Sequence, residues 1–226
     1  MTGEGWESRV VARSLGAAKK RSLDRSRAFI EAAVALLREK GHGFTLEEVS
    51  ARAGFSQRLF YQHFGGKQDL LLAVLEEELR VATLDIRAEV NREPDPLRRL
   101  VRLLDLFLKG PREHVPHNLA LISYELGLVT THPQQVARAH APEAELAGEV
   151  LAAGIEAGVL TLRSAEEGAY MVIALKRAYN HSRLVGNELG MMLPPPEELI
   201  RFCVEGLGAQ LTEYAASTKE PITPGR

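Results

Sequence analysis

The fold of this chain is decided by residues 44–64, which read FTLEEVSARAGFSQRLFYQHF. Thr45 is followed three residues later by Glu48. This is the spacing of a capping box, in which each side chain accepts a hydrogen bond from the other residue's free backbone N–H at the start of a helix. The pattern predicts a helix that begins at Leu46 and ends near Ala53.

A second short helix is predicted directly after the first. Gly54 permits the positive φ of a tight turn, and Ser56 is a favourable N-cap for a helix over Gln57–His63. Two short helices joined by a three-residue turn form a helix-turn-helix. In that arrangement the first helix braces the second, which protrudes far enough to enter a DNA major groove about 12 Å wide.

Helices also account for the rest of the chain. Apolar residues recur at helical spacing over residues 23–40, and a long helix is predicted from Lys67 to Asn91. No alternating β-branched run bounded by turns is present in the sequence, so a sheet is not expected. The prediction is an all-α fold of about nine helices, the last five of which cover residues 97–109, 116–131, 134–157, 164–187 and 195–217.

Composition narrows the class of protein. The 226 residues are 45% hydrophobic and 26% charged, which suits a globular chain and excludes disorder throughout. The single cysteine, Cys203, excludes an intrachain disulfide and a cysteine-rich zinc site. No apolar run has the length of a membrane span, and we expect a reducing, cytoplasmic location.

Charge is divided unevenly along the chain. The formal net charge is −2, but the first 70 residues are net positive and the remainder is net negative. We therefore expect only the N-terminal region to meet a polyanion. The second short helix fits this expectation, although the spacing alone also allows an ordinary helical hairpin with a solvated face. Its polar residues, which suit base edges or phosphates, are Gln57, Arg58, Tyr61, Gln62 and His63.

Residues 44–70 resemble the DNA-binding segment of TetR-family transcriptional regulators. The turn at residues 53–56 (AGFS), the run at residues 60–64 (FYQHF) and Lys67 fill the places of the family's pattern. The resemblance extends over about residues 23–72. The sequence departs from the pattern at three places, which are Ser50 in place of Ala, Leu59 in place of a small residue or Thr, and Gly65-Gly66 in place of Pro-Ser.

The resemblance implies roles for individual residues. Gln57, Arg58 and Gln62 would read bases, since arginine pairs with guanine and glutamine with adenine. The residues implied to contact phosphates, or to complete the DNA-binding set, are Thr45, Ser56, Tyr61, His63 and Lys67. Residues 1–22 are interpreted as a flexible basic arm. Lys19, Lys20, Arg21 and Arg25 would reach the DNA backbone or an adjacent minor groove.

The resemblance also divides the chain into domains. Residues 23–70 would form the helix-turn-helix domain and residues 71–217 an effector-binding and dimerisation domain, followed by a disordered tail at 218–226. A small-molecule pocket needs apolar walls and a few orienting polar groups. The candidate effector-binding residues are Phe107, Asn118, Leu121, Tyr124, Glu125, Arg177 and Asn180.

The last two helices are expected to form a homodimer. One apolar stripe comprises Ala165, Ala169, Val172, Ile173 and Lys176, and the other comprises Ile200, Cys203, Val204, Leu207 and Leu211. The alternative is that these stripes are core within one chain.

The functional hypothesis is a homodimeric repressor that binds a palindromic double-stranded DNA operator and releases it when a small hydrophobic effector binds. No cofactor, metal or membrane partner is expected, and no phosphate loop, nucleophile elbow or paired acidic motif indicates an enzyme. Two alternatives stay open: an activator or nucleoid-type binder without a ligand, and a helical carrier of a small molecule or metal. The histidines that invite a metal interpretation are His114, His117, His132 and His140.

Overall fold

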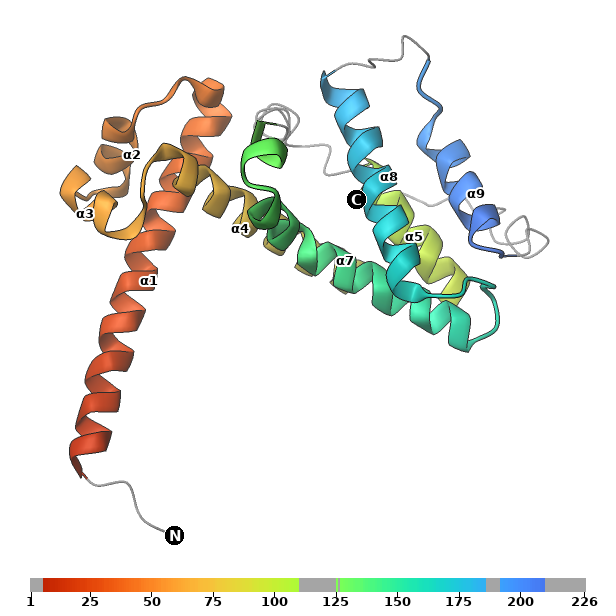
Figure 1. The fold of residues 1–226 in the computed structure, drawn as a ribbon, viewed down its shortest axis with the longest axis horizontal. Coiled ribbons are helices and arrows are strands. Elements are labelled where there is room, and N and C mark those ends of the chain that lie inside the picture. Colours follow the sequence, from red (N-terminus) through yellow and green to blue (C-terminus); the bar gives the residue numbers. More distant parts are fainter. Residues whose placement is uncertain (1–5, 110–124, 126, 186–191, 210–226) are drawn as a thin grey trace, which may run out of the picture. The chain divides into compact units, whose positions relative to one another are not determined.

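The computed structural model describes residues 6–109, 125, 127–185 and 192–209, and within them all regular structure is helical, without a strand. This confirms the all-α prediction. In chain order (Figure 1) the elements are α1 (Trp6–Lys40), the 3-10 helix η1 (Gly41–Gly43), α2 (Leu46–Ala53), α3 (Gln57–His63), α4 (Lys67–Val90), α5 (Pro96–Lys109), α7 (Pro133–Glu156), α8 (Ala165–Val185) and α9 (Pro196–Gly206). Residues 127–131 are also helical. None of the described helices is both long and apolar enough to cross a bilayer.

The chain folds as two compact units, Met1–Leu75 and Glu76–Arg226, and α4 begins in the first and ends in the second. In the first unit α2 and α3 pack against the C-terminal part of α1 (Figure 1). In the second unit α5 contacts α7, α8 and α9, and α7 also packs along α8.

The local signals of the helix-turn-helix form as predicted. The Thr45 side chain accepts a hydrogen bond from the Glu48 N–H, and the Glu48 carboxylate accepts one from the Thr45 N–H at 2.8 Å, so the capping box is complete. Gly54 has φ 74°, in the left-handed region that favours glycine. The Ser56 hydroxyl accepts from the Leu59 N–H and caps α3.

Aromatic rings form the core of the first unit. Phe29 of α1 is fully buried, and its ring meets Phe60 of α3 edge-on, with 5.4 Å between the ring centroids. Phe64, which directly follows α3, meets Phe29 edge-on at 6.2 Å, and Phe55 of the turn lies 5.6 Å from it. Edge-to-face pairs at such distances add to the hydrophobic gain of burial. These rings therefore hold α3 against α1.

The start of α1 departs from the sequence prediction. We expected an arm over residues 1–22 and a helix from residue 23, but α1 begins at Trp6. The prediction relied on apolar periodicity, which residues 6–22 lack, and the described side chains of this stretch, Val10 and residues 14–22, are all exposed. They contain no proline and many residues of good helix propensity, so the backbone continues the helix without burial.

In the second unit, the apolar sides of α5, α7, α8 and α9 pack together and form a core. Buried residues of α5 are Leu100, Leu103, Leu104, Phe107 and Leu108, those of α7 include Leu146, Val150 and Leu151, and those of α8 and α9 include Val172, Ile173, Ile200 and Val204. Pro142 lies inside α7, and the helix continues through it.

The stripes assigned to a dimer interface lie in this core instead. Ala169, Val172 and Ile173 of α8 are buried within the chain, as are Ile200 and Cys203 of α9. The interface prediction for these residues is therefore wrong, because packing against α7 and α5 covers those of α8 and packing against α5 covers those of α9, and the alternative of intrachain core is confirmed. Burial raises the pKa of the Cys203 thiol to about 11. Leu211 lies outside the described residues.

The last helix is shorter than predicted. We expected it to reach residue 217, but α9 ends at Gly206. Gly208 has φ 83°, and a Cβ atom there would lie 1.8 Å from the Thr161 hydroxyl oxygen. The Thr161 N–H donates to the Leu207 carbonyl at 3.3 Å. The chain thus turns at Gly208 to pack closely on the segment between α7 and α8.

Replacing Phe29 with Ala should lower the free energy of unfolding by about 3–5 kcal/mol, because the change leaves a cavity among three rings. The control is Leu23→Ala on the same helix, where the side chain is 49% exposed and a change within about 0.5 kcal/mol is expected. Urea unfolding followed by circular dichroism measures both. Equal losses in the two variants would contradict the central place of Phe29.

Candidate nucleic-acid interface and a buried polar cluster

The exposed side of α3 is polar and free of acidic groups. Gln57, Arg58, Tyr61 and Gln62 are exposed, and they share one side of the helix because positions i, i+1, i+4 and i+5 lie close around its axis. Tyr61 is 59% exposed, which is high for an aromatic side chain. This side offers amide, guanidinium and hydroxyl donors together, which is the chemistry that base edges and phosphates accept.

Two basic residues on neighbouring elements are paired with acids. Both terminal nitrogens of the Arg52 guanidinium donate to the Glu39 carboxylate, at 2.6 and 2.7 Å. Lys40 forms an ion pair with Glu48. Arg58 forms no ion pair with any described residue, so its charge stays available to a ligand on the exposed side of α3.

His63 faces α1 instead of lying on the exposed side. Its Nδ1 atom lies 3.0 Å from the Ser26 hydroxyl oxygen, and its ring centroid lies 6.3 Å from that of Phe29. His63 therefore helps to join the end of α3 to α1. Thr45 and Ser56 likewise use their side-chain oxygens as helix caps. The DNA contacts assigned to these three residues stay predictions.

Lys67 has a structural task that the sequence did not reveal. Its ammonium group donates to the backbone carbonyls of His42 and Phe44, at 2.7 and 2.6 Å, and lies 4.1 Å from the centroid of the Phe44 ring. Burial lowers the pKa of Lys67, although the charge of Glu48 opposes this. The lysine thus ties the start of α4 to the segment before α2. Its phosphate contact stays a prediction.

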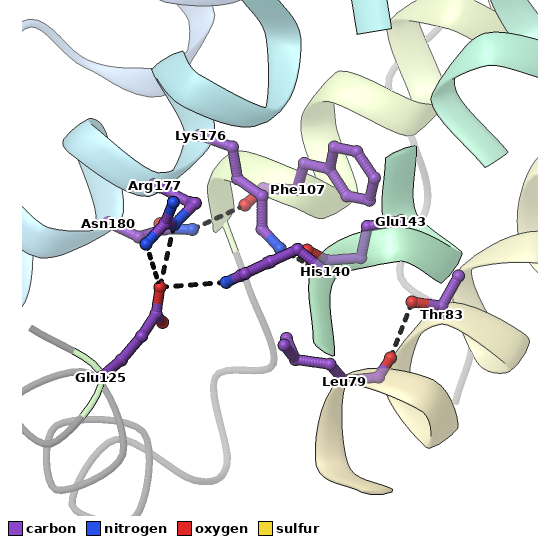
Figure 2. Close-up of polar contacts among 9 residues, drawn as sticks. All are labelled: Leu79, Thr83, Phe107, Glu125, His140, Glu143, Lys176, Arg177 and Asn180. Carbon is purple, nitrogen blue, oxygen red and sulfur yellow. Dashed lines mark hydrogen bonds and ion pairs between the residues drawn. The ribbon is translucent and has the colours of Figure 1, made fainter. Parts of the chain in front are cut away.

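The second unit contains a cluster of buried charges (Figure 2). The His140 ring of α7 lies between two carboxylates, with Nδ1 2.9 Å from Glu143 Oε2 and Nε2 2.9 Å from Glu125 Oε1. Lys176 of α8 pairs with the other oxygen of Glu143, and Arg177 Nε donates to Glu125 Oε1 at 2.8 Å. We call these five residues the buried ion cluster.

Mutual pairing keeps the cluster ionised despite its burial. Burial alone raises the pKa of Glu143, which is 1% exposed, but Lys176 and His140 lower it to about 2. Burial also opposes ionisation of Glu125, yet His140 and Arg177 lower its pKa below the usual value. Burial lowers the pKa of His140, and the two carboxylates more than compensate and raise it.

Four of the seven predicted effector residues lie in or beside this cluster. Glu125 and Arg177 are members, and Asn180 Nδ2 donates to the Phe107 carbonyl at 2.9 Å, beside the cluster (Figure 2). The buried Oδ1 atom of Asn180 accepts no hydrogen bond from any residue that the structure describes. The Lys176 ammonium lies 4.9 Å from the centroid of the Phe107 ring. The remaining candidates, Asn118, Leu121 and Tyr124, lie outside the described residues.

The hydrogen bond between His140 and Glu143 was not predicted from the sequence. Their i, i+3 spacing could have predicted the contact, because residues three apart lie next to each other on a helix. His140 was weighed only as a metal ligand, but its neighbours include two cations, which oppose a metal ion. Among the described residues no group of three His, Cys, Asp or Glu side chains could hold a metal. His114 and His117 lie outside them.

Comparison with known proteins agrees with the geometry of the first unit. The model of the family described as "Bacterial regulatory proteins, tetR family" matches residues 29–74. The transcriptional regulators BetI of Brucella anthropi and Brucella canis are 31% and 30% identical over 81 residues, which is 35% of this chain. Residues 29–74 of this chain are therefore a domain of the TetR family of transcriptional regulators. The matches span 42% and 41% of the two BetI chains, so less than half of those relatives is covered.

Solved structures share the fold of this chain beyond its first unit. RolR in complex with resorcinol has a TM-score of 0.64 at 18% identity, covering 91% of this chain and 98% of RolR. FadR of Bacillus halodurans has a TM-score of 0.60 at 18% identity, over 82% and 97%. FadR of Bacillus subtilis in complex with stearoyl-CoA has a TM-score of 0.51 at 16% identity, over 80% and 96%. At these identities the likeness concerns the fold alone.

Replacing Glu143 with Ala should lower the free energy of unfolding by about 3–5 kcal/mol, because Lys176 and His140 lose their shared partner in a buried site. The matched control is Glu145→Ala, an exposed carboxylate on the same helix, which should change stability by less than about 0.5 kcal/mol. Chemical unfolding at neutral pH distinguishes the two.

The pH dependence of unfolding gives a second test of the cluster. The pKa of Glu143 is lowered from 4.5 to about 2, so its stabilisation is present above pH 4.5 and is lost as the pH falls toward 2. The pKa of His140 is raised from 6.5, so its stabilisation is present below pH 6.5 and is lost as the pH rises through the raised value. A His140→Gln variant that kept the alkaline loss would contradict this assignment.

Proposed function

We propose that this TetR-family regulator is a repressor that binds a palindromic operator as a homodimer, with α3 in the major groove, and that a small molecule bound in the second unit releases the DNA. The observation that supports this most directly is the exposed side of α3. It combines unpaired arginine, glutamine and tyrosine side chains on a helix whose opposite side is fixed to α1 by buried rings.

The residues of α3 divide between base reading and backbone contact. Arg58 has the two parallel donors that match guanine O6 and N7, and Gln57 and Gln62 match the donor and acceptor of adenine. Tyr61 has a single hydroxyl, which suits a phosphate oxygen and carries no sequence information by itself. We assign base specificity to Arg58 and the two glutamines. Tyr61 would position α3 along the DNA through its phosphate contact.

Replacing Arg58 with Ala should relax preference at one base pair per half-site and cost roughly 1–3 kcal/mol of discrimination. Operators are first selected from random duplexes with the wild-type protein, and variants are then measured on single-base substitutions. The control is Arg38→Ala, which removes an exposed positive charge from α1 and should leave base preference unchanged. Unaltered preference in Arg58→Ala would remove this residue from base reading.

Dimerisation is assigned to the sides of α8 and α9 that the intrachain core leaves exposed. Tyr170 and Met171 of α8 are 76% and 60% exposed, and Phe202 of α9 is 66% exposed. Ala174 and Ala178 extend the exposed side of α8 at helical spacing. Large apolar side chains with such exposure are typical of a surface that a partner covers. A second copy is the partner that a palindromic operator requires.

Replacing Met171 with Glu should yield a folded monomer, because a dimer through α8 would bury the new charges beside the symmetry axis. The control is Leu84→Glu on α4, where an apolar side chain is 52% exposed, and this variant should stay dimeric. Size-exclusion chromatography with light scattering measures the mass, and circular dichroism verifies folding. A Met171→Glu dimer of unchanged affinity would contradict this interface.

We place the effector-binding site beside Phe107, Asn180 and the buried ion cluster. The RolR and FadR structures named above hold resorcinol and stearoyl-CoA, which makes an organic ligand a reasonable class for this fold. The unpartnered Oδ1 of Asn180 is a free acceptor for a ligand hydroxyl or amide. Release of operator DNA is screened with apolar compounds that have one or two hydrogen-bond donors. If none weakens DNA binding, the repressor is not controlled by this chemistry.

Such a ligand acts only through a difference in affinity between two conformations. Changing the DNA-competent fraction from 99% to 1% requires about 10⁴-fold tighter binding to the released state. An apolar molecule that is largely buried can supply this difference, which a small polar ion cannot supply through surface contacts alone.

A further inference from the structure

Nitrogen atoms from two helices converge on one oxygen of Glu125 (Figure 2). Arg177 of α8 donates to Oε1 through Nε at 2.8 Å, and its Nη2 atom lies 2.5 Å from the same oxygen. The Nε2 atom of His140 in α7 lies 2.9 Å from this oxygen. No described residue donates to the other oxygen, Oε2. The arginine and the histidine thus surround a position that suits an oxyanion.

The charges of the buried ion cluster favour an anion over a cation at this position. His140 faces Glu143 with Nδ1 and Glu125 with Nε2, both at 2.9 Å. An imidazole ring donates through both nitrogens only when it is protonated. Three cations, His140, Lys176 and Arg177, then face two carboxylates. Without the Glu125 carboxylate the three cations would share Glu143 alone, which is unfavourable in a largely buried site.

The two donors are held by contacts that do not involve Glu125. His140 is fixed through Nδ1 by Glu143 on its own helix, and Glu143 pairs with Lys176 of α8. The helices α7 and α8 also pack along each other. Glu125 belongs to neither helix and precedes the helical residues 127–131. A separate part of the chain therefore supplies the anion to a site that α7 and α8 form between them.

Two buried polar atoms without partners follow Arg177 on α8. Asn180 Oδ1 and His181 Nε2 form no hydrogen bond with any residue that the structure describes. Their residues are three and four positions after Arg177, so they lie on the same side of the helix, about 5 Å further along its axis. Buried polar atoms are nearly always paired, so these two indicate a place where a ligand's polar groups are missing. The buried ring of Phe107 lies beside them, since the Phe107 carbonyl accepts from Asn180 Nδ2.

We propose that Arg177 and His140 bind the carboxylate of an organic acid, and that Glu125 occupies this position until the acid replaces it. The inference rests on the proposed function, because it names the chemical class of the effector. Exchange of one carboxylate for another keeps the number of ion pairs constant, so the polar part of the exchange costs little free energy. The apolar part of the acid packs on Phe107 and supplies the affinity. A hydroxyl or amide group about one helical turn from the carboxylate donates to Asn180 Oδ1.

This exchange links the occupancy of the site to conformation. The acid binds only where the Glu125 carboxylate has left, so its affinity differs between the two positions of Glu125. A ligand changes a conformational equilibrium only through such a difference in affinity. The exchange therefore provides the discrimination between two states that release of an operator requires.

The test compounds come in sets that share one carbon skeleton, with a carboxylate, its primary amide and the corresponding primary amine. Phenylacetate, 3-phenylpropionate, 3-hydroxyphenylacetate and octanoate provide these sets. Calorimetric titration of the full wild-type chain should give at least one carboxylate a dissociation constant about 10- to 100-fold lower than that of its amide, because the amide loses the charge-assisted hydrogen bonds. The amine should bind no more tightly than the amide. The same carboxylate should release a selected operator at a lower concentration than its amide does.

Two variants should change carboxylate binding in opposite directions. Arg177→Gln should remove the preference for the carboxylate over the amide. Glu125→Gln should raise the affinity for the carboxylate about tenfold or more, because the site is then open in every molecule instead of in a minor fraction. The matched controls, Arg138→Gln and Glu145→Gln, each remove one exposed charge from α7 and should keep the wild-type affinities. Circular dichroism verifies the folding of each variant.

The inference is wrong if no carboxylate binds more tightly than its amide, if an amine binds most tightly, or if folded Arg177→Gln keeps the wild-type preference. If Arg177→Gln does not fold, a Glu125→Gln variant without increased carboxylate affinity overturns the inference. Operator release by carboxylates and amides at equal concentrations would leave the proposed function intact and remove the anion site. Carboxylates that bind with the expected preference but leave the operator bound would support the anion site and contradict release by the ligand. A wild-type protein that binds no duplex would overturn the proposed DNA binding itself.

Discussion

The packing of Phe29 against the rings of Phe60 and Phe64 sets the orientation of α3, and the exposed side of α3 depends on that orientation. A helix of seven residues has too few internal hydrogen bonds to be stable alone. Its structure therefore relies on its caps and on the rings that it buries against α1. Because Phe60 points inward, Arg58, Tyr61 and Gln62 point outward. A change in the ring packing would change the direction in which the side chains proposed to contact DNA project.

The two units differ in where their ion pairs lie. In the first unit, ion pairs on α1 and α2 lie at the surface, where such pairs add little to stability, and the cations of α3 and of residues 14–25 stay unpaired. In the second unit, His140, Glu143, Lys176 and Glu125 of the buried ion cluster are largely removed from water, Arg177 stays 37% exposed, and the five ions satisfy one another. Removing one of them leaves an uncompensated charge, so the cluster is sensitive to single substitutions and to pH.

Sequence patterns predicted the elements of the helix-turn-helix because their signals act over three or four residues. Thr45 and Glu48 form the expected capping box, Gly54 has the expected positive φ, and Ser56 caps α3 as expected. The same reasoning failed where helix formation or helix termination had a different cause. The start of α1 was missed because residues 14–25 are exposed and lack an apolar stripe, and the end of α9 was missed because Gly208 turns the chain against Thr161.

The sequence by itself determined the helical content, the two short helices and the types of side chain that α3 exposes. Tertiary structure decided which apolar faces the chain covers itself, and so placed Val172 and Ile200 in the core instead of at a dimer surface. It also decided the ion pairs, since Glu125 and Arg177 are 52 residues apart and Glu143 and Lys176 are 33 apart. Capping and turn signals depend on hydrogen bonds between near neighbours, whereas burial and long-range pairing depend on which helices pack together, and no local pattern specifies that.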